Sequence, residues 1–262
     1  MKESTKKSVA DSMETRTKML PFLPFLIQDL WVMGSSIDQI LSGIQSLDLP
    51  ANTTVLDLCC GKGGVSVQIA KKFGFKVTGV DVMSVFLDIA NKKAEEHNVS
   101  HLCEFIEQDV NDYVKDSHNF DLVILAAVGA VFGEIKRTVD ILRSQIKIGG
   151  YILVDDGYLR EESQSADRKG YEYCMSYQDT KDAFLSFGDR MVTEISTSEV
   201  SKDINYEYHK LIEKRGAELI KMHPEIAADI RNYIDNQAEE CDVLDKEIEG
   251  MLWIIQKAKT QS

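Results

Sequence analysis

The feature that most constrains the fold is a glycine-rich segment at residues 53–64, Thr-Thr-Val-Leu-Asp-Leu-Cys-Cys-Gly-Lys-Gly-Gly. Residues 53–58 are short, β-branched and apolar, which predicts a strand buried on both faces of a parallel sheet. Residues 65–73 then predict a helix. Glycines between a strand and a helix let the chain turn sharply, and the free N–H groups at the helix start favour an anionic ligand group.

A second apolar run, residues 75–80, ends at Asp81. This is the layout of a mononucleotide-binding βαβ unit, in which the acidic side chain accepts hydrogen bonds from ribose hydroxyls. A dinucleotide fingerprint needs G-x-G-x-x-G/A, but the last position counted from Gly61 is Ser66. Asp57 stands just before the loop, where a carboxylate disfavours a pyrophosphate and suits a ligand with a cationic amino-acid end.

Residues 55–63, Val-Leu-Asp-Leu-Cys-Cys-Gly-Lys-Gly, resemble the first motif of class I S-adenosylmethionine-dependent methyltransferases, h-h-D/E-h-G-x-G-x-G. Residues 77–81, Val-Thr-Gly-Val-Asp, resemble the second strand of that family and its ribose-binding acid. Cys59 stands where the family usually has its first glycine, and we expect a slightly tighter loop that still binds the cofactor. The resemblance implies an α/β fold with a doubly wound, seven-stranded, mostly parallel sheet, the Rossmann-like methyltransferase fold.

The resemblance also implies a set of cofactor-binding positions at the ends of predicted strands and in the loops that follow them. They are Asp57, Cys59, Gly61, Gly63, Asp81, Val82, Asp109, Val110 and Ala126. The first four are expected to hold the methionine end of S-adenosylmethionine, Asp81 the ribose, and Asp109 with Val110 the adenine. For Asp109, the initiation of a turn is an alternative role.

The remaining elements complete the sheet. Further strands are predicted over residues 101–106, 120–128, 148–155, 190–197 and 250–256, and helices over residues 37–47, 85–97, 135–146 and 179–187. Ser36 and Ser84 are the predicted N-caps of the first two of these helices. The loop after residues 120–128 lacks the Asn/Asp-Pro-Pro-Tyr/Phe signature of amide and base nitrogen methylation, which argues against a DNA base methyltransferase.

Two segments lie outside this unit, and we expect both to contribute to a helical cap. Residues 203–247 carry no strand pattern and predict a two-helix insertion before the last strand, which resembles small-molecule methyltransferases near the ubiquinone and menaquinone biosynthesis type. The predicted division is an N-terminal helical segment or lid at residues 1–50 and a methyltransferase domain at residues 51–262. Residues 1–18 are polar and read as frayed or loosely helical.

Residues 19–33 are markedly apolar, and two interpretations stay open. The segment either packs on the edge of the sheet or forms a lid over the substrate, with Phe22, Phe25 and Trp31 as apolar walls.

Methyl transfer from a sulfonium is an in-line displacement, so positioning and desolvation do most of the work and no acid or base is obligatory. No catalytic residue is therefore assigned. Polar side chains with a candidate role at the acceptor are Asp156, Tyr158, Tyr206, Tyr208 and His209. A surface position is the alternative for His209.

The composition of the chain limits the classes of substrate and the cellular compartment that we expect. A formal net charge of −13 disfavours a nucleic-acid substrate. The cysteines form no C-x-x-C pair, residues 1–18 lack the apolar stretch of a signal peptide, and no run of apolar residues is long enough to span a membrane, so the expectation is a reduced, cytoplasmic protein. His97 and His101 need not share a helix face, and no metal is expected.

The predicted function is S-adenosylmethionine-dependent methylation of a small-molecule acceptor. The alternatives are a nicotinamide-dependent oxidoreductase and a non-catalytic S-adenosylmethionine-binding protein. The acceptor and the oligomeric state stay open, with a homodimer among the options.

Overall fold

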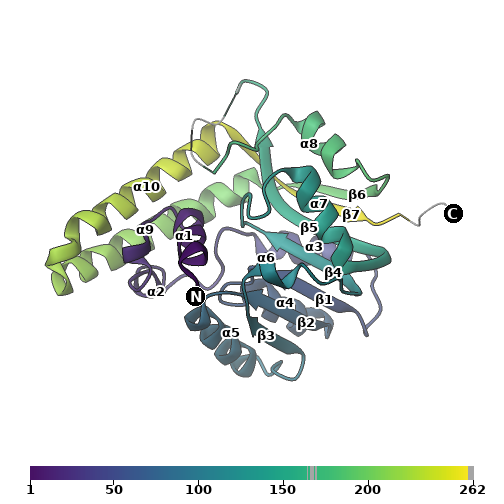
Figure 1. The fold of residues 1–262 in the computed structure, drawn as a ribbon, viewed down its shortest axis with the longest axis horizontal. Helices are drawn as coiled ribbons and strands as arrows, with labels where there is room; N and C mark the ends of the chain where they lie inside the picture. The colour runs from purple at the N-terminus through teal and green to yellow at the C-terminus, as the bar shows by residue number, and fades with distance from the viewer. Residues whose placement is uncertain (164, 166–167, 169, 259–262) are drawn as a thin grey trace.

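The protein is described by a computed structural model that covers residues 1–163, 165, 168 and 170–258. A seven-stranded sheet lies at its centre, in the order β3-β2-β1-β4-β5-β7-β6 (Figure 1). The strands are β1 Thr54–Leu58, β2 Lys76–Asp81, β3 Cys103–Glu107, β4 Phe120–Ala126, β5 Ile146–Leu159, β6 Arg190–Ser196 and β7 Ile248–Gln256. Strands β1 to β5 pair in parallel, and β7 runs antiparallel to β5 and to β6. The predicted fold class is confirmed.

Helices cover both faces of the sheet. Those of the sheet domain are α3 Ile37–Gln45, α4 Gly64–Phe73, α5 Ser84–Glu96, α6 Val110–Tyr113, α7 Ile135–Gln145 and α8 Tyr177–Phe184. Apolar side chains of α7 and α8 meet one face of the strands in a single buried cluster, and those of α3, α4 and α5 meet the other face in a second cluster. The near-continuous apolar sequence of the central strands follows from this burial on both sides.

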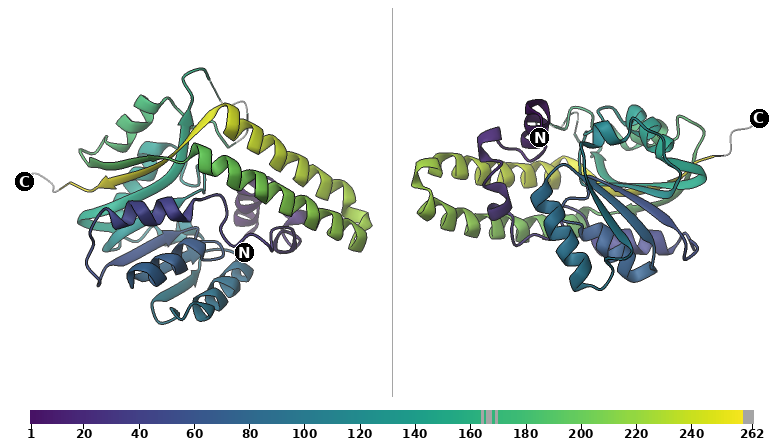
Figure 2. Two further views of the ribbon diagram at one scale, coloured as in Figure 1. Left: turned by 180° about the vertical axis from the view of Figure 1, so that it is seen from behind. Right: turned by 60° about the horizontal axis from the view of Figure 1, so that its bottom comes forward.

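Three further elements lie beside a long helical hairpin that extends past the sheet (Figure 2). The hairpin consists of α9 Ser198–Met222, η2 Pro224–Ile226 and α10 Ala227–Lys246, and the N-terminal elements are α1 Glu3–Ser12, η1 Thr17–Met19 and α2 Leu23–Leu26. A third buried cluster joins apolar residues of the N-terminal elements to α9 and α10, with Phe86 of α5. The edge-of-sheet interpretation of residues 19–33 is therefore wrong, and of the two alternatives for residues 1–18 the structure shows the helical one, over Glu3–Ser12.

Several predicted boundaries also differ. Strand β5 continues to Leu159 because its far end pairs with β7 as far as Ile248, so Asp155 and Asp156 lie within the strand and do not close it. Helix α9 begins at Ser198, before the predicted insertion. The Ser36 hydroxyl accepts a hydrogen bond from the Gln39 amide at 3.4 Å and caps α3 as predicted. Ser84 instead lies in the first turn of α5, since Met83 occupies the cap position.

Candidate functional site

A cavity of about 990 Å³ lies at the carboxyl ends of the parallel strands. Its walls come from the loops after β1, β2, β3 and β4, from residues 5–35, and from α9 and α10. Ligands of open α/β sheets bind at this edge. Because small-molecule sites occupy roughly 300–1,000 Å³, the cavity has room for a nucleoside-sized cofactor together with a second small molecule.

The loop after β1 is held in a left-handed backbone conformation. Cys59, Gly61 and Gly63 have φ values of 57°, 52° and 71°. At Gly63, a Cβ atom would lie 2.7 Å from the Cβ of Ala90, so only glycine fits. Cys59 adopts the same conformation at a cost of about 1–2 kcal/mol, which is why glycine is the better residue here.

Asp57 is the last residue but one of β1 and faces the cavity with only 3 % of its surface exposed. Its Oδ2 accepts a hydrogen bond of 2.5 Å from the Ser66 hydroxyl. Burial raises the pKa of the Asp57 carboxyl to about 7. A cationic ligand group next to this carboxylate would stabilise its ionised form.

Asp81 closes β2, and two backbone amides fix its carboxylate. Its Oδ2 accepts from the Gly61 amide at 2.9 Å and its Oδ1 from the Met83 amide at 2.8 Å. Burial raises the pKa of this carboxyl. Since each carboxylate oxygen has two lone pairs, both oxygens can also accept from ligand hydroxyls. Val82 lies in the cavity wall beside it.

Asp109, after β3, has two partners within the protein. Its Oδ1 accepts from the Asn111 amide at 3.0 Å and caps α6, so the turn-forming role occurs. Its Oδ2 accepts from the Thr5 hydroxyl at 2.8 Å, which brings α1 over the end of β3. Val110 and Ala126 line the same cavity. Of the predicted cofactor positions, Gly63 alone lies outside the lining, beneath the loop.

The N-terminal segment lies directly on the glycine loop. The Lys62 ammonium donates to the Leu30 carbonyl at 2.7 Å and to the Ile27 carbonyl, and the Trp31 indole donates to the Lys62 carbonyl at 3.0 Å. Lys62 is 1 % exposed, and burial lowers its pKa to about 8. Sequence reasoning missed this lysine because its position in the motif has no prescribed residue.

The predicted acceptor-facing residues divide into two groups. Asp156, Tyr206, Tyr208 and His209 line the cavity, although Tyr206 is 62 % exposed and lies at its rim. The prediction for Tyr158 is wrong. Its ring contacts those of Tyr177 and Trp253, with centroids 5.2 and 6.1 Å away, because it fills an apolar space beside α8.

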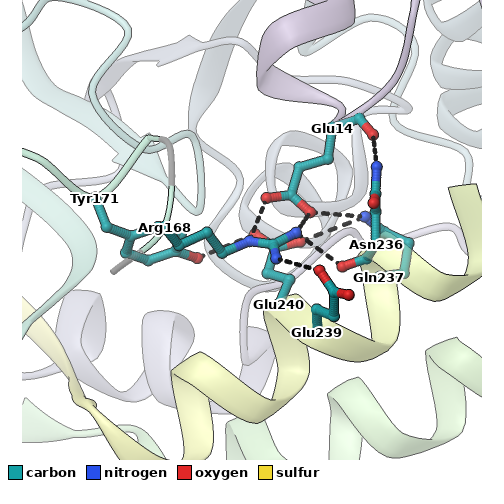
Figure 3. Close-up of polar contacts among 7 residues, drawn as sticks. All are labelled: Glu14, Arg168, Tyr171, Asn236, Gln237, Glu239 and Glu240. Carbon is teal, nitrogen blue, oxygen red and sulfur yellow. Dashed lines mark hydrogen bonds and ion pairs between the residues drawn. The ribbon is translucent and has the colours of Figure 1, made fainter. Parts of the chain in front are cut away.

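A polar network at the other end of the cavity joins the loop after α1, the segment before α8 and helix α10 (Figure 3). The Arg168 guanidinium binds both carboxylate oxygens of Glu14 and donates to the Asn236 carbonyl at 2.8 Å. The Tyr171 hydroxyl donates to Glu240 at 3.0 Å. Burial, and then the charge of Glu14, raise the pKa of Glu240 to about 7.

Sequence reasoning missed this network. One signal was present, since Glu240 follows Tyr233 by two helical turns on the buried stripe of α10. The polar sequence of residues 159–177, with its clustered tyrosines, also predicts a mobile loop near the site, and this prediction lies partly outside the described residues.

In the part of the chain that the structure describes, no group of three or more His, Cys, Asp or Glu side chains is arranged to hold a metal ion. His97 stacks on Trp31 with ring centroids 5.2 Å apart, which gives this histidine a packing role. Within the same ranges, no helix has both the length and the apolar character needed to cross a bilayer.

Comparison with known proteins identifies the fold and the sequence family. Residues 49–215 match the profile of a methyltransferase domain. YjhP of Escherichia coli, described as an uncharacterized protein, is 32 % identical over 117 residues, which are 44 % of this chain and 46 % of YjhP. The malonyl-[acyl-carrier protein] O-methyltransferase of Priestia megaterium is 28 % identical, over 47 % of this chain and 43 % of the relative. The chain thus spans less than half the length of these curated relatives.

The fold has close counterparts among solved structures. A SAM-dependent methyltransferase from Thiobacillus denitrificans, crystallised with S-adenosyl-L-homocysteine, superimposes with a TM-score of 0.77 at 18 % identity, covering 91 % of this chain and 98 % of the other. At that identity the likeness extends to the fold.

Proposed function

The chain belongs to the methyltransferase domain family, and from this premise we propose that it transfers the methyl group of S-adenosylmethionine to a small organic acceptor. S-adenosylmethionine is the cofactor that this family assignment calls for. The observation that carries the proposal is the single cavity onto which Asp57, Asp81, Asp109 and the glycine loop all open.

The residues present fit this cofactor. Asp57 is a buried carboxylate with no cationic partner among the described residues, which suits the ammonium of the methionine end. The two oxygens of Asp81 are positioned for the paired hydroxyls of a ribose. Asp109 and Val110 stand where the family's adenine-contacting residues stand. When bound, the cofactor supplies an electrophilic methyl group on a sulfonium, and the residues of this chain bind, orient and exclude water.

We further propose that residues 1–50 act as a lid and that residues 203–247 act as a cap, so that the acceptor must be small enough to be enclosed. The contacts of Leu30 with Lys62 and of Thr5 with Asp109 join residues 1–50 to two loops of the cavity wall, which supports the lid. Residues of α9 and α10 line the same cavity, which supports the cap. An enclosed site excludes water during transfer, which favours displacement at the methyl carbon over side reactions. All five cysteines are free, which is consistent with the cytoplasmic location that we propose.

Isothermal titration calorimetry with S-adenosylhomocysteine tests the site. Asp81→Ala removes charge-assisted hydrogen bonds to the ribose, at a cost of about 1.5–3 kcal/mol, which corresponds to a loss of affinity of roughly 10- to 150-fold. The matched control is Asp88→Ala, which removes an exposed carboxylate from the neighbouring helix α5. Equal affinity of wild type and Asp81→Ala would reject the assignment of Asp81.

Saturable fluorescence enhancement of NADH would favour the oxidoreductase alternative. Tight cofactor binding without methylation of any acceptor in a broad panel would favour the non-catalytic one.

A further inference from the structure

We infer that the end of the cavity beyond the cofactor residues binds the ammonium group of an amine acceptor. The inference rests on the proposed function and specifies the chemical class of its substrate. Three features of the cavity wall carry it: the carboxylates, the aromatic side chains beside them, and the cationic side chains that already have partners.

Carboxylates dominate the cavity wall beyond the positions assigned to the cofactor. They include Glu14, Asp155, Asp156 and Glu240. Asp156 is exposed to the cavity although protein surrounds it, and burial raises its pKa. Its carboxylate accepts a hydrogen bond from its neighbour, the Gly157 amide, at 2.8 Å, and it has no ion-pair partner among the described residues. A cation in the cavity would therefore meet an uncompensated carboxylate.

The network around Arg168 brings one cation together with three carboxylates, Glu14, Glu240 and the 72 % exposed Glu239 (Figure 3). Arg168 is bound to Glu14, and Glu240 accepts from the Tyr171 hydroxyl at 3.0 Å and from the Gln237 side-chain amide at 3.4 Å. Burial, and then the charges of Glu240, Glu14 and Asp156, raise the pKa of Tyr171, so these three carboxylates lie near one phenol. Since the network contains one guanidinium, ionisation of both Glu14 and Glu240 leaves at least one negative charge that an ammonium would neutralise.

Aromatic side chains line the same region. Tyr171 comes from the segment before α8, Tyr208 from α9 and Tyr233 from α10, and all three belong to the cavity wall. Tyr233 is buried and Tyr208 is half-buried. Aromatic ring faces beside carboxylates are a preferred environment for alkylammonium groups, because the ring quadrupole attracts a cation without the desolvation cost of a further charge.

The described cations of the wall are already paired, which argues against an anionic acceptor. Lys62 donates to two backbone carbonyls. Arg160 binds Glu249 at 2.5 Å, and Lys202 binds Asp245 at 2.7 Å. A phosphate or carboxylate acceptor would thus enter a cavity whose wall carboxylates outnumber these cations, with the buried Arg160 Nε and His209 Nε2 as nitrogen atoms of the wall that have no partner among the described residues.

The protons and electron pairs of methyl transfer to an amine can be accounted for with the carboxylates of the cavity wall. The ammonium first loses one proton, which passes to the carboxylate of Asp156 or Glu240 and then to solvent. The nitrogen lone pair then forms the N–C bond while the S–C bond breaks. The electron pair of the broken S–C bond goes to sulfur, which becomes a neutral thioether. The methylated product carries the positive charge on nitrogen.

Calorimetry on the full chain saturated with S-adenosylhomocysteine tests the inference with two probes of similar size, phenethylamine, which is a cation at neutral pH, and 2-phenylethanol, which is neutral. We expect phenethylamine to bind at least about tenfold more tightly. Because the pKa of Glu240 is raised to about 7, amine binding at pH 7 should also release protons, seen as a heat that differs between phosphate and Tris buffers.

Variants locate the ammonium site. Glu240→Gln and Asp156→Asn should each reduce the preference for the amine about tenfold, while Asp235→Asn, which removes an exposed carboxylate of α10 outside the cavity wall, should leave it unchanged. Equal affinity for the two probes, no binding of either at millimolar concentration, or a preference that survives both cavity variants would overturn the inference. The affinity for S-adenosylhomocysteine separates the two claims, since its loss in the wild type would overturn the proposed function itself.

Discussion

Replacing Lys62 with methionine should loosen the contact between the glycine loop and the N-terminal segment. The lysine stem is buried among apolar atoms, and its ammonium lies 5.6 Å from the centroid of the Phe86 ring. Methionine keeps most of the apolar stem but cannot donate to the carbonyls of Ile27 and Leu30.

The size of the effect follows from what the variant loses and regains. Each hydrogen bond from a charged group contributes about 1.5–3 kcal/mol, and each carbonyl left without a donor adds a desolvation cost. Removing the ammonium also removes the cost of burying it, which is several kcal/mol. We therefore expect a net loss of about 2–4 kcal/mol, which lowers the melting temperature by roughly 4–16 °C in a domain of this size.

Urea denaturation followed by circular dichroism, with and without S-adenosylhomocysteine, measures this loss. The matched control is Lys72→Met in helix α4, which follows the glycine loop, where the lysine is exposed beside Phe73. We expect the control to change stability by less than about 0.5 kcal/mol, as surface substitutions do. If Lys62→Met were as stable as Lys72→Met, the bonds of Lys62 would not hold the N-terminal segment, and the lid proposal would lose its main contact.

Two further predictions concern the loop and the buried acid. Gly74→Ala, at a φ of 71° and with no atom within 4 Å of the added Cβ, should cost only the left-handed strain of about 1–2 kcal/mol, measured by thermal denaturation. Gly63→Ala, at the same φ, adds a clash with Ala90 and should cost about 2–4 kcal/mol more than Gly74→Ala. Equal losses would contradict the close contact at Gly63. Burial raises the pKa of Asp155 from 3.8 to about 7, so between these pH values the folded state binds more protons than the unfolded state. The stability of the ligand-free protein therefore falls as pH rises through this interval. Asp155→Asn should reduce the dependence of melting temperature on pH between 5 and 8, with Asp57 and Glu240 supplying the remainder, and Asp140→Asn on the exposed face of α7 should leave the dependence as in the wild type; a wild-type slope in Asp155→Asn would contradict this prediction.

The part of the site that could be predicted from the sequence is the part built from neighbouring residues. Short connections link the strand at residues 53–58, the glycine loop and Asp81. The turn that the chain makes at each of these positions therefore determines which residue types fit there. The fold class, a doubly wound seven-stranded sheet, followed from the family resemblance. These elements account for the cofactor end of the cavity.

The acceptor end could not be predicted, because distant segments build it. Glu14 contacts Arg168 and Asn236, which lie more than 150 residues away in the sequence. No pattern of neighbouring residues predicts such a contact. Tyr158 was misassigned for the same reason, since only the packing of α8 against β7 decides where its ring lies. Glu240 was missed because periodicity selects the apolar positions of a helix and does not indicate which polar side chain beside them is buried.

Hydrogen–deuterium exchange with S-adenosylhomocysteine tests most directly whether the cavity at the strand ends is the cofactor site. Binding should slow amide exchange in peptides that cover residues 57–66, 81–83 and 109–113, and in residues 27–33 that lie on the glycine loop, because the ligand and the closed segment protect these backbone groups. Peptides from β6, at the edge of the sheet, and from residues 139–145 of α7 contain no residue of the cavity wall and should exchange at the same rate with and without ligand. Unchanged exchange at residues 57–66 and 81–83 under saturating ligand, or protection confined to β6 and residues 139–145, would contradict the account.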